Sequence, residues 1–503
     1  MGDAMSSADL TCGAHRRAKK SSIGVAVLAL AVALCIVVHP SLASADERRL
    51  GLSYVLDGVE VNGNTVTRLP VILRYLHVHA GETIDVDDPA LEMMRYRLLG
   101  TGFFRDVQIS LRRGATRGHA ILVLDVVERN TVVINGVWLG LATAATARGS
   151  AEPLTPYAGV EAAETNLAGT GIALGGGVAF ADQQLALRAR FSDSQFLGTE
   201  WSTEAQLFFS NGRDFFINRD AVLNDPSNVT RDDSGVVRYR RFGGLVGVGH
   251  DLTSSIRASA AYRLESLDAE FPASPVTLGV VHDTVDYKIL RGRSIVSSLR
   301  FAALRDTRDD PVLPRIGDLA FVSSDISMRP LGSEYTFVKV EAEYNRWFAL
   351  PWGHVLRLQG FAGGVFGNAP FMDTFYVGDL SDLLPDRVLG LNFDRRPAPN
   401  FLGTSIVEQR YGNYAAKIST EYRVPIYRGH RSIYGADIFG SFGFYSLTSA
   451  HDLSHPPRGY KGLAAIPVDI TFNIGLRVDT SAGAFTLGIS NLLGLIPVRH
   501  EAR

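Results

Sequence analysis

Residues 335–344 have the sequence YTFVKVEAEY, and residues 298–317 have the sequence SLRFAALRDTRDDPVLPRIG. In the first run, apolar side chains at 338, 340, 342 and 344 alternate with Lys339, Glu341 and Glu343. Successive side chains of a β-strand point to opposite faces of its sheet, so the alternation predicts a strand with one oily and one charged face. The second run ends in turn residues, among them two prolines that cannot donate to a ladder. We therefore expect a hairpin here.

The first 45 residues have the layout of a secretory signal peptide. Four basic side chains between 16 and 20 precede an apolar run from Ile23 to Val38, and small residues stand at Ala43 and Ala45. This pattern predicts that residues 1–45 are removed by cleavage between Ala45 and Asp46. The apolar run is shorter than the roughly 20 residues that a spanning helix needs, which disfavours the alternative of an uncleaved anchor.

Composition excludes several classes of function. Both cysteines, Cys12 and Cys35, lie in the expected leader, so the exported chain would have neither disulfides nor thiolate metal sites. Removal of the leader's four basic and two acidic side chains changes the formal charge from −2 to −4, and such a chain has no electrostatic footprint for nucleic acid. The sequence contains neither a Gly-x-Ser-x-Gly elbow nor a His-Glu-x-x-His motif. We predict no enzyme activity, no catalytic or metal-binding residues and no cofactor.

Residues 46–130 have the pattern of a small α/β domain. A strand is expected up to Asn62, where a turn signal follows. Apolar residues at 69, 72, 73 and 76 predict a first helix, because that spacing places them on one helical face. Asp88 and Pro89 predict the start of a second helix, with Gly100 as its C-cap. Two strands follow, the second from Ile121 to Val127, which gives the order β-α-α-β-β.

Residues 131–503 instead show recurrent period-two alternation, for example at 256–265, 416–423 and 472–479. Short turns such as 250–253 alternate with long polar loops such as 211–240. A soluble β-sandwich would also alternate, but an export signal and this loop asymmetry are typical of outer-membrane barrels. We therefore predict a mainly β protein with a transmembrane antiparallel β-barrel of roughly 16 strands. The side chains at the apolar alternating positions, such as Val340, should face lipid.

The chain resembles the Omp85 superfamily (BamA/TamA, bacterial surface antigen D15). The segments 61–64 (VNGN), 100–107 (GTGFFRDV) and 126–129 (VVER) resemble a POTRA domain, and 165–171 (TNLAGTG) resembles an early strand motif of the family's barrels. The resemblance implies a POTRA domain at 46–130 and a barrel at 131–503. The most specific match is the mid-barrel turn motif at 306–317, with Asp306, Arg308, Asp309, Pro311 and Gly317.

The resemblance also implies a loop that enters the barrel lumen with a Val-Arg-Gly-Phe/Tyr motif. Here Leu389 occupies the arginine position and Leu391 the aromatic position, while Gly390 is retained. Arg387 lies two residues upstream, and we expect it to replace the missing arginine. Its inward pairing candidates by parity are Glu341 and Glu343. The alternative is that Arg387 is a solvated loop cation.

The implied function is the insertion or translocation of polypeptides at the bacterial outer membrane, with the POTRA domain in the periplasm and without a covalent step. Its partners would be the lipid bilayer, unfolded polypeptide clients and periplasmic accessory proteins. Family members are thought to act through a weak seam between the first and last strands, whose edge templates a client strand. The alternative is a passive outer-membrane pore or a structural surface antigen.

Overall fold

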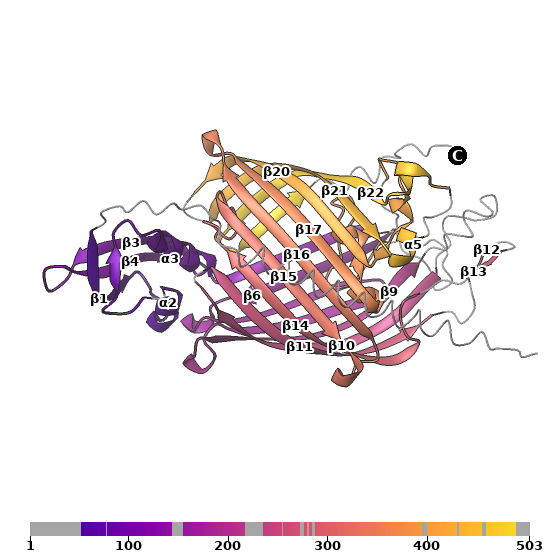
Figure 1. Ribbon diagram of the computed structural model, residues 1–503, viewed down its shortest axis with the longest axis horizontal. Coiled ribbons are helices and arrows are strands. Elements are labelled where there is room, and N and C mark those ends of the chain that lie inside the picture. Colours follow the sequence, from indigo (N-terminus) through magenta and orange to yellow (C-terminus); the bar gives the residue numbers. More distant parts are fainter. Residues whose placement is uncertain are drawn as a thin grey trace, which may run out of the picture.

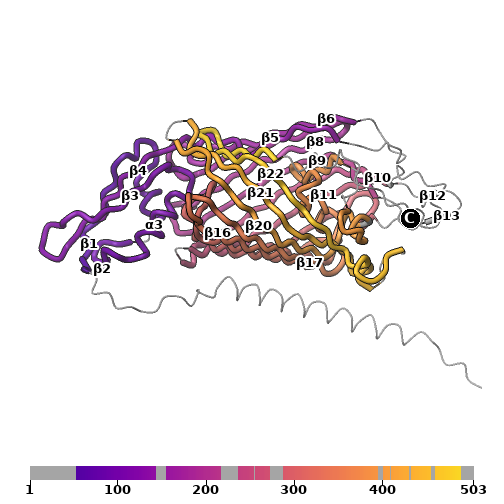
Figure 2. Tube along the Cα trace, turned by 90° about the horizontal axis from the view of Figure 1, so that it is seen from above, coloured from indigo at the N-terminus to yellow at the C-terminus, as the bar shows by residue number. Residues whose placement is uncertain are grey.

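A computed structural model shows a tilted β-barrel with a small α/β domain beyond one of its ends (Figures 1 and 2). It describes residues 52–76, 78–142, 154–216, 235–253, 255–271, 276–278, 281–283, 287–394, 400–429, 432–454 and 459–488. The expected leader and its cleavage site at Ala45 and Asp46 lie outside this part of the chain.

The barrel is one antiparallel sheet in which strands that follow one another along the chain lie side by side. Within the described residues it has 15 strands, one fewer than the approximate number that the sequence predicted. They are β5 (Val132–Ala142), β6 (Thr155–Glu164), β7 (Ile172–Ala181), β8 (Gln184–Asp193), β9 (Trp201–Phe216), β10 (Gly235–Asp251), β11 (Ile256–Glu270), β14 (Gly292–Asp306), β15 (Gly317–Ser327), β16 (Thr336–Ala349), β17 (Val355–Asn368), β20 (Tyr414–Arg428), β21 (Ile433–Thr448), β22 (Val468–Thr480) and β23 (Gly483–Gly488).

The predicted alternation divides the barrel wall into two faces. In β11, Arg263 and Glu265 form ion pairs with groups inside the barrel, whereas the intervening Leu264 is 50% exposed on the outside. This is the polar-in, apolar-out pattern of a membrane barrel. Val340 has the outward parity, but only 7% of it is exposed. The ring of Phe366 lies over its cross-strand partner Gly364 and shields this part of the outer face.

The N-terminal α/β domain (residues 53–128) has the strand order β2-β1-β4-β3. Strands β1 and β4 are parallel, and the other two pairs are antiparallel. Its core contains Ile72 and Leu98 from the two helices and Leu122 and Leu124 from β4. The elements are β1 (Ser53–Asn62), α2 (Leu69–Leu76), β2 (Thr83–Asp85), α3 (Pro89–Gly100), β3 (Phe104–Arg113) and β4 (His119–Glu128).

The expected order of this domain is correct except for one short strand. The three-residue β2 was missed, because three residues carry no measurable periodicity. Asp88 caps α3 as predicted, accepting a 2.8 Å hydrogen bond from the Ala90 N–H. The C-cap prediction was wrong: Thr101 is the cap residue, and the left-handed glycine that follows is Gly102, with φ 74°.

Three smaller features belong to the connections of the barrel. A short hairpin of β12 (Val276–Leu278) and β13 (Val281–Asp283) lies between β11 and β14, and helix α5 (Ala450–Ser454) lies between β21 and β22. Between β17 and β20, the two-residue strands β18 (Phe375–Tyr376) and β19 (Tyr411–Gly412) pair with each other. Among the described residues, the helices are all too short or too polar to cross a bilayer.

Candidate functional site

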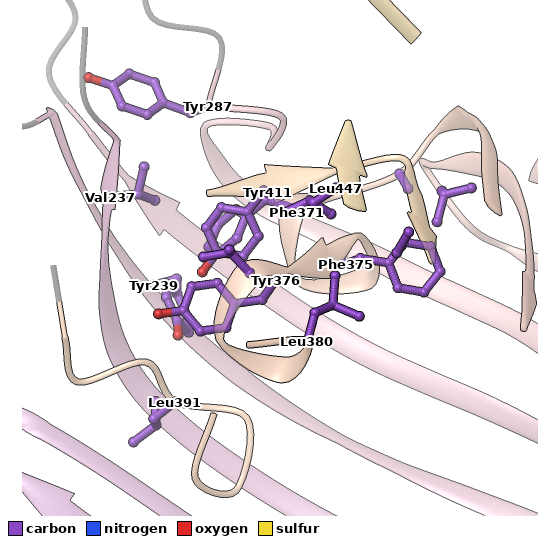
Figure 3. Packing of buried hydrophobic residues seen from close by; sticks show 14 of the residues in the cluster. Val237, Tyr239, Tyr287, Phe371, Phe375, Tyr376, Leu380, Leu391, Tyr411 and Leu447 are labelled. Carbon is purple, nitrogen blue, oxygen red and sulfur yellow. The ribbon is translucent and has the colours of Figure 1, made fainter. Parts of the chain in front are cut away.

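The long connection between β17 and β20 folds into the barrel. We call residues 369–394 and 400–413 the lumen segment. Its aromatic side chains Phe371, Tyr376 and Tyr411 pack together and against Tyr239 of β10 (Figure 3). The cluster reaches further wall strands through Phe337, Val365 and Leu447. The protein's own chain therefore occupies part of the lumen.

A charged contact joins the lumen segment to β11. Arg263 donates two hydrogen bonds of 2.7 Å, one to each carboxylate oxygen of Asp373. Next to this pair, Arg241 of β10 donates through its Nε to Glu265 at 2.5 Å. Bidentate arginine–carboxylate pairs fix geometry as well as energy. The network therefore fixes the start of the lumen segment to β11, which the Arg241–Glu265 pair joins to β10.

A second anchor is the buried carboxylate of Asp214 in β9. It accepts a hydrogen bond from the Tyr411 hydroxyl and another, of 3.4 Å, from the Asn392 amide. The Arg410 guanidinium lies 3.6 Å away. One wall residue thus holds two separate parts of the lumen segment.

The opposite side of the lumen segment is held by β20 and β22. Asp382 pairs with Lys417 at 3.2 Å, and its backbone N–H donates to the Thr471 hydroxyl at 2.7 Å. Asp469 accepts hydrogen bonds of 3.1 Å from the N–H groups of Phe401 and Leu402. The segment is therefore attached on both sides of the lumen.

Arg387 lies in the lumen segment, but its predicted partners were wrong. Its guanidinium pairs with Asp379, eight residues upstream, and donates to the Met372 carbonyl at 3.1 Å. Glu341 instead pairs with Lys339 at 2.8 Å, and Glu343 accepts from Gln359 at 3.0 Å. Asp379 is close to Arg387 in the chain, so the two can pair within the lumen segment. Glu341 and Glu343 already have partners on the barrel wall, in Lys339 and Gln359.

The residues at the family's motif positions form a tight turn. Val388 and Leu391 exchange backbone hydrogen bonds of 2.9 and 3.0 Å, and Leu389 and Gly390 between them have φ of 50° and 85°. Two positive φ angles in succession are typical of a type I′ turn, for which glycine is suited and leucine is not.

Two glycines in the wall accommodate this turn. A Cβ atom on Gly212 of β9 would lie 2.7 Å from the Leu391 side chain, and one on Gly177 of β7 would lie 3.2 Å from Leu389. Leu391 is fully buried. The apolar side chains that replace the family's arginine and aromatic residue therefore fit into hollows in the wall.

The predicted turn motif at 306–317 forms an ordered turn at the domain end of the barrel. Arg308 donates hydrogen bonds of 2.9 and 2.7 Å to Asp306 and one of 3.1 Å to the Pro311 carbonyl. Asp309 accepts from the Arg315 N–H at 2.8 Å, and Gly317 has φ 99° with the Thr307 carbonyl beside its Cα. The motif residues bond one another, so their evident role is to shape the turn.

The edges of the barrel meet at a seam, which we define as the contact between β5 and β23. The two strands touch, but among the described residues they form no ladder. Beside the last strand, the Ile134 N–H donates to the Ala482 carbonyl at 2.7 Å. At the same end, Arg129 pairs with Asp479 at 3.0 Å, and the Asn130 amide donates to the Ser481 carbonyl at 2.7 Å. The seam is held at the end nearest the N-terminal domain.

The N-terminal domain is attached to the barrel by the motif at 165–171. The Asn166 amide donates to the Thr67 hydroxyl at 2.9 Å, and the Arg68 N–H donates to the Gly169 carbonyl at 3.0 Å. Gly169 has φ 71°, and the Val66 carbonyl occupies the space that a Cβ atom would need. A glycine is therefore required at this contact.

Glu128 orders the domain side of that attachment. It accepts a hydrogen bond of 2.6 Å from the Thr65 hydroxyl and others of 2.6–3.0 Å from the N–H groups of Thr65, Val66 and Thr67. Partial burial by itself would raise the pKa of Glu128, but these hydrogen bonds outweigh burial and lower the pKa to about 2.

Several of these residues were not predicted from the sequence. Arg263 and Glu265 stood out as the polar parity of a strand, but no local pattern indicated Asp214, Asp373 or Gly212. Their partners lie far away in the chain, so only the folded barrel reveals them. Across the described parts of the chain, no group of three or more His, Cys, Asp and Glu side chains is placed to hold a metal ion.

The tilted barrel, its polar interior and apolar exterior, and the lumen segment define a class: outer-membrane β-barrel proteins whose lumen contains a segment of their own chain. Residues 166–444 match the model of the Omp85 superfamily domain, which is more than half of the chain. The chain belongs to the Omp85 superfamily.

The chain is also similar to individual known proteins. The chain is 24% identical over 356 residues to "Outer membrane protein assembly factor BamA" of Nitratidesulfovibrio vulgaris; the match covers 68% of this chain but only 40% of that relative. CdiB from Escherichia coli has the same fold, with a TM-score of 0.53 at 11% identity over 87% of this chain and 72% of that one. BamA from Haemophilus ducreyi lacking POTRA domains 1–3 gives a TM-score of 0.45 at 15% identity over 87% and 81% of the two chains.

Proposed function

We propose that this protein inserts or translocates polypeptides at the outer membrane without a covalent step. The observation that carries the proposal is the seam between β5 and β23. An unpaired strand edge is a template for another strand, because its N–H and C=O groups lack partners. Among the described residues, the side-chain and backbone contacts at the seam are those of Arg129, Asn130 and Ile134, and all of them lie at one end. A client strand would add to the β5 edge by β-augmentation.

In this proposal the N-terminal α/β domain is a POTRA domain in the periplasm, spanning residues 46–130, and residues 131–503 form the barrel. Unfolded polypeptides would be the clients, and periplasmic accessory proteins are the further partners. The assembly role printed for the BamA relative supports this direction, although the chain spans 40% of that relative's length.

A disulfide across the seam tests the proposal directly. Ile134→Cys and Ala482→Cys would be combined in a chain in which Cys12 and Cys35 are replaced by serine. The control pair, Val248→Cys with Ala260→Cys, joins strands that are already paired. The assay is the folding of a urea-denatured barrel protein into liposomes that contain the variant.

We expect the oxidised seam variant to lose client folding and to regain it on reduction, while the control pair keeps its activity in both states. Equal client folding by the oxidised and reduced seam variants would refute a seam-based mechanism. The passive pore is a further outcome of the same preparation: steady, porin-like conductance without client folding. The lumen segment counts against that pore, because its aromatic cluster occupies part of the lumen.

A further inference from the structure

A pocket lies where the N-terminal domain meets the mouth of the barrel. Its volume is about 210 Å³. One wall comes from helix α3, and the other comes from the β10–β11 and β14–β15 turns. Neither the family assignment nor the proposed function gives this pocket a role. The lining includes Tyr96, Arg97, Asp251, Arg257, Asp306 and Arg308.

The pocket has a surplus of positive charge. Asp251 is approached by three guanidinium groups: Arg257 at 2.6 Å, Arg97 at 3.2 Å and Arg74 at 3.9 Å. Arg74 does not itself line the pocket, and it also donates to the Glu200 carbonyl. The third arginine of the lining, Arg308, has a bidentate contact with Asp306. The lining thus has three arginines and two carboxylates, and one positive charge remains.

Two of the guanidinium nitrogens are buried without a hydrogen-bond partner. They are Nη1 of Arg97, whose side chain is 10% exposed, and Nε of Arg74. A buried donor that lacks an acceptor is destabilising, because water no longer satisfies it. Arg97 lines the pocket, so its guanidinium group lies beside an anion bound there.

We propose that this pocket binds a phosphate group. Guanidinium groups bind phosphate oxygens bidentately, and a phosphate offers more acceptor oxygens than a carboxylate, enough for Arg97 and Arg257 together. The net positive charge of the lining favours an anion. Tyr75, Met93 and Leu304 form an apolar side of the pocket, which suits the carbon atoms of a glycerophosphate. The source is either a phospholipid headgroup or free phosphate.

Titration calorimetry on the full chain in a phosphate-free detergent tests the proposal, with inorganic phosphate as the probe at fixed ionic strength. Arg97→Gln should weaken phosphate binding about tenfold or more, because it removes a charged donor. The matched control is Arg95→Gln on the same helix. Arg95 donates to the Val107 carbonyl and does not line the pocket, so phosphate binding should not change.

Asp251→Asn separates a binding role from a structural one. It removes the carboxylate that competes with the ligand, so phosphate should bind several-fold more tightly, although a domain–barrel ion pair is lost. If the arginines served only to attach the domain to the barrel, Asp251→Asn would disturb their arrangement and would not tighten phosphate binding. No phosphate binding by the wild type, or weaker binding by Asp251→Asn, would overturn the proposal.

A second arm identifies the source of the phosphate. The wild type is titrated with inorganic phosphate after transfer to phosphatidylglycerol nanodiscs. Loss of the phosphate signal there means that the lipid headgroup occupies the pocket, and an unchanged signal means that free phosphate is the ligand. Both results support the phosphate site, and neither depends on client folding.

Discussion

Arg263 of β11 forms a bidentate pair with Asp373 of the lumen segment, in which its two Nη atoms donate hydrogen bonds of 2.7 Å. The pair lies at the start of the segment, beside the buried Arg241–Glu265 pair. Much of the segment's attachment to this side of the wall depends on this contact.

Replacing Asp373 by Ala should therefore release the start of the segment. Loss of one partner of a largely buried pair costs about 3 kcal/mol, because the other charge remains unpaired. We expect a higher single-channel conductance in planar bilayers and a lower unfolding temperature in gel-shift assays. Arg293→Gln, at an exposed position of β14, is the control and should change neither. Unaltered conductance in Asp373→Ala would show that apolar packing alone holds the segment.

The Arg387–Asp379 pair predicts a different result, since both partners belong to the lumen segment. Arg387→Gln, Asp379→Asn and the double variant should have similar, non-additive effects on conductance, because each removes the same contact. Glu341→Gln should couple to Arg387→Gln much more weakly than Asp379→Asn does, because the direct ion pair of Arg387 is with Asp379. Equally strong coupling between positions 341 and 387 would restore the pairing that the sequence suggested.

The outer face of β11 offers a sharper test of lipid exposure than Val340, which is shielded. Leu264→Arg should destabilise the barrel by about 2–4 kcal/mol if this position lies near the middle of the bilayer. Leu264→Ala, which adds no charge and leaves no internal cavity, should cost much less. Unfolding of both variants in lipid vesicles measures the difference; equal losses of stability would contradict the assigned face.

Glu128 predicts a pH dependence of the attachment between the domain and the barrel. Its pKa is lowered from the ordinary 4.5 to about 2, so its stabilising effect is complete above about pH 4.5 and is lost as pH falls towards 2. With allowance for its partial exposure, the effect is on the order of 2 kcal/mol. Hydrogen exchange of the amides at 65–67 in the full chain reports it. Glu128→Gln should speed that exchange at pH 7, and the difference from the wild type should narrow as pH falls below 4.5.

Much of the architecture could be predicted because it follows from the periodic spacing of apolar residues along short stretches of the chain. Alternation of side chains gave the barrel strands and their two faces, and i, i+3, i+4 spacing gave α2. The turn motif at 306–317 was identified by its resemblance to the family's motif, and many of its hydrogen bonds join residues within it, such as Arg308 and Asp306.

The interior of the barrel could not be predicted in the same way. Asp214 meets Tyr411 only after the segment has folded back into the lumen. Parity correctly placed Lys339 and Glu341 on the polar side, but parity does not choose between possible partners on one face. Arg387 pairs with Asp379, a carboxylate of its own segment that strand parity does not indicate.

The contact between Arg129 and Asp479 joins residues that are 350 positions apart. Contacts that close so long a stretch of chain have a large entropic cost until the intervening strands are in place, so they form late in folding. The residues just after the N-terminal domain can therefore contact the β22–β23 hairpin only after nearly the whole barrel has formed. Maturation of this protein would then end with the docking of its own final hairpin, and a chain truncated before Asp479 should insert without ever closing. Resistance of such a truncated chain to unfolding in gel-shift assays, equal to that of the full chain, would contradict this order of events.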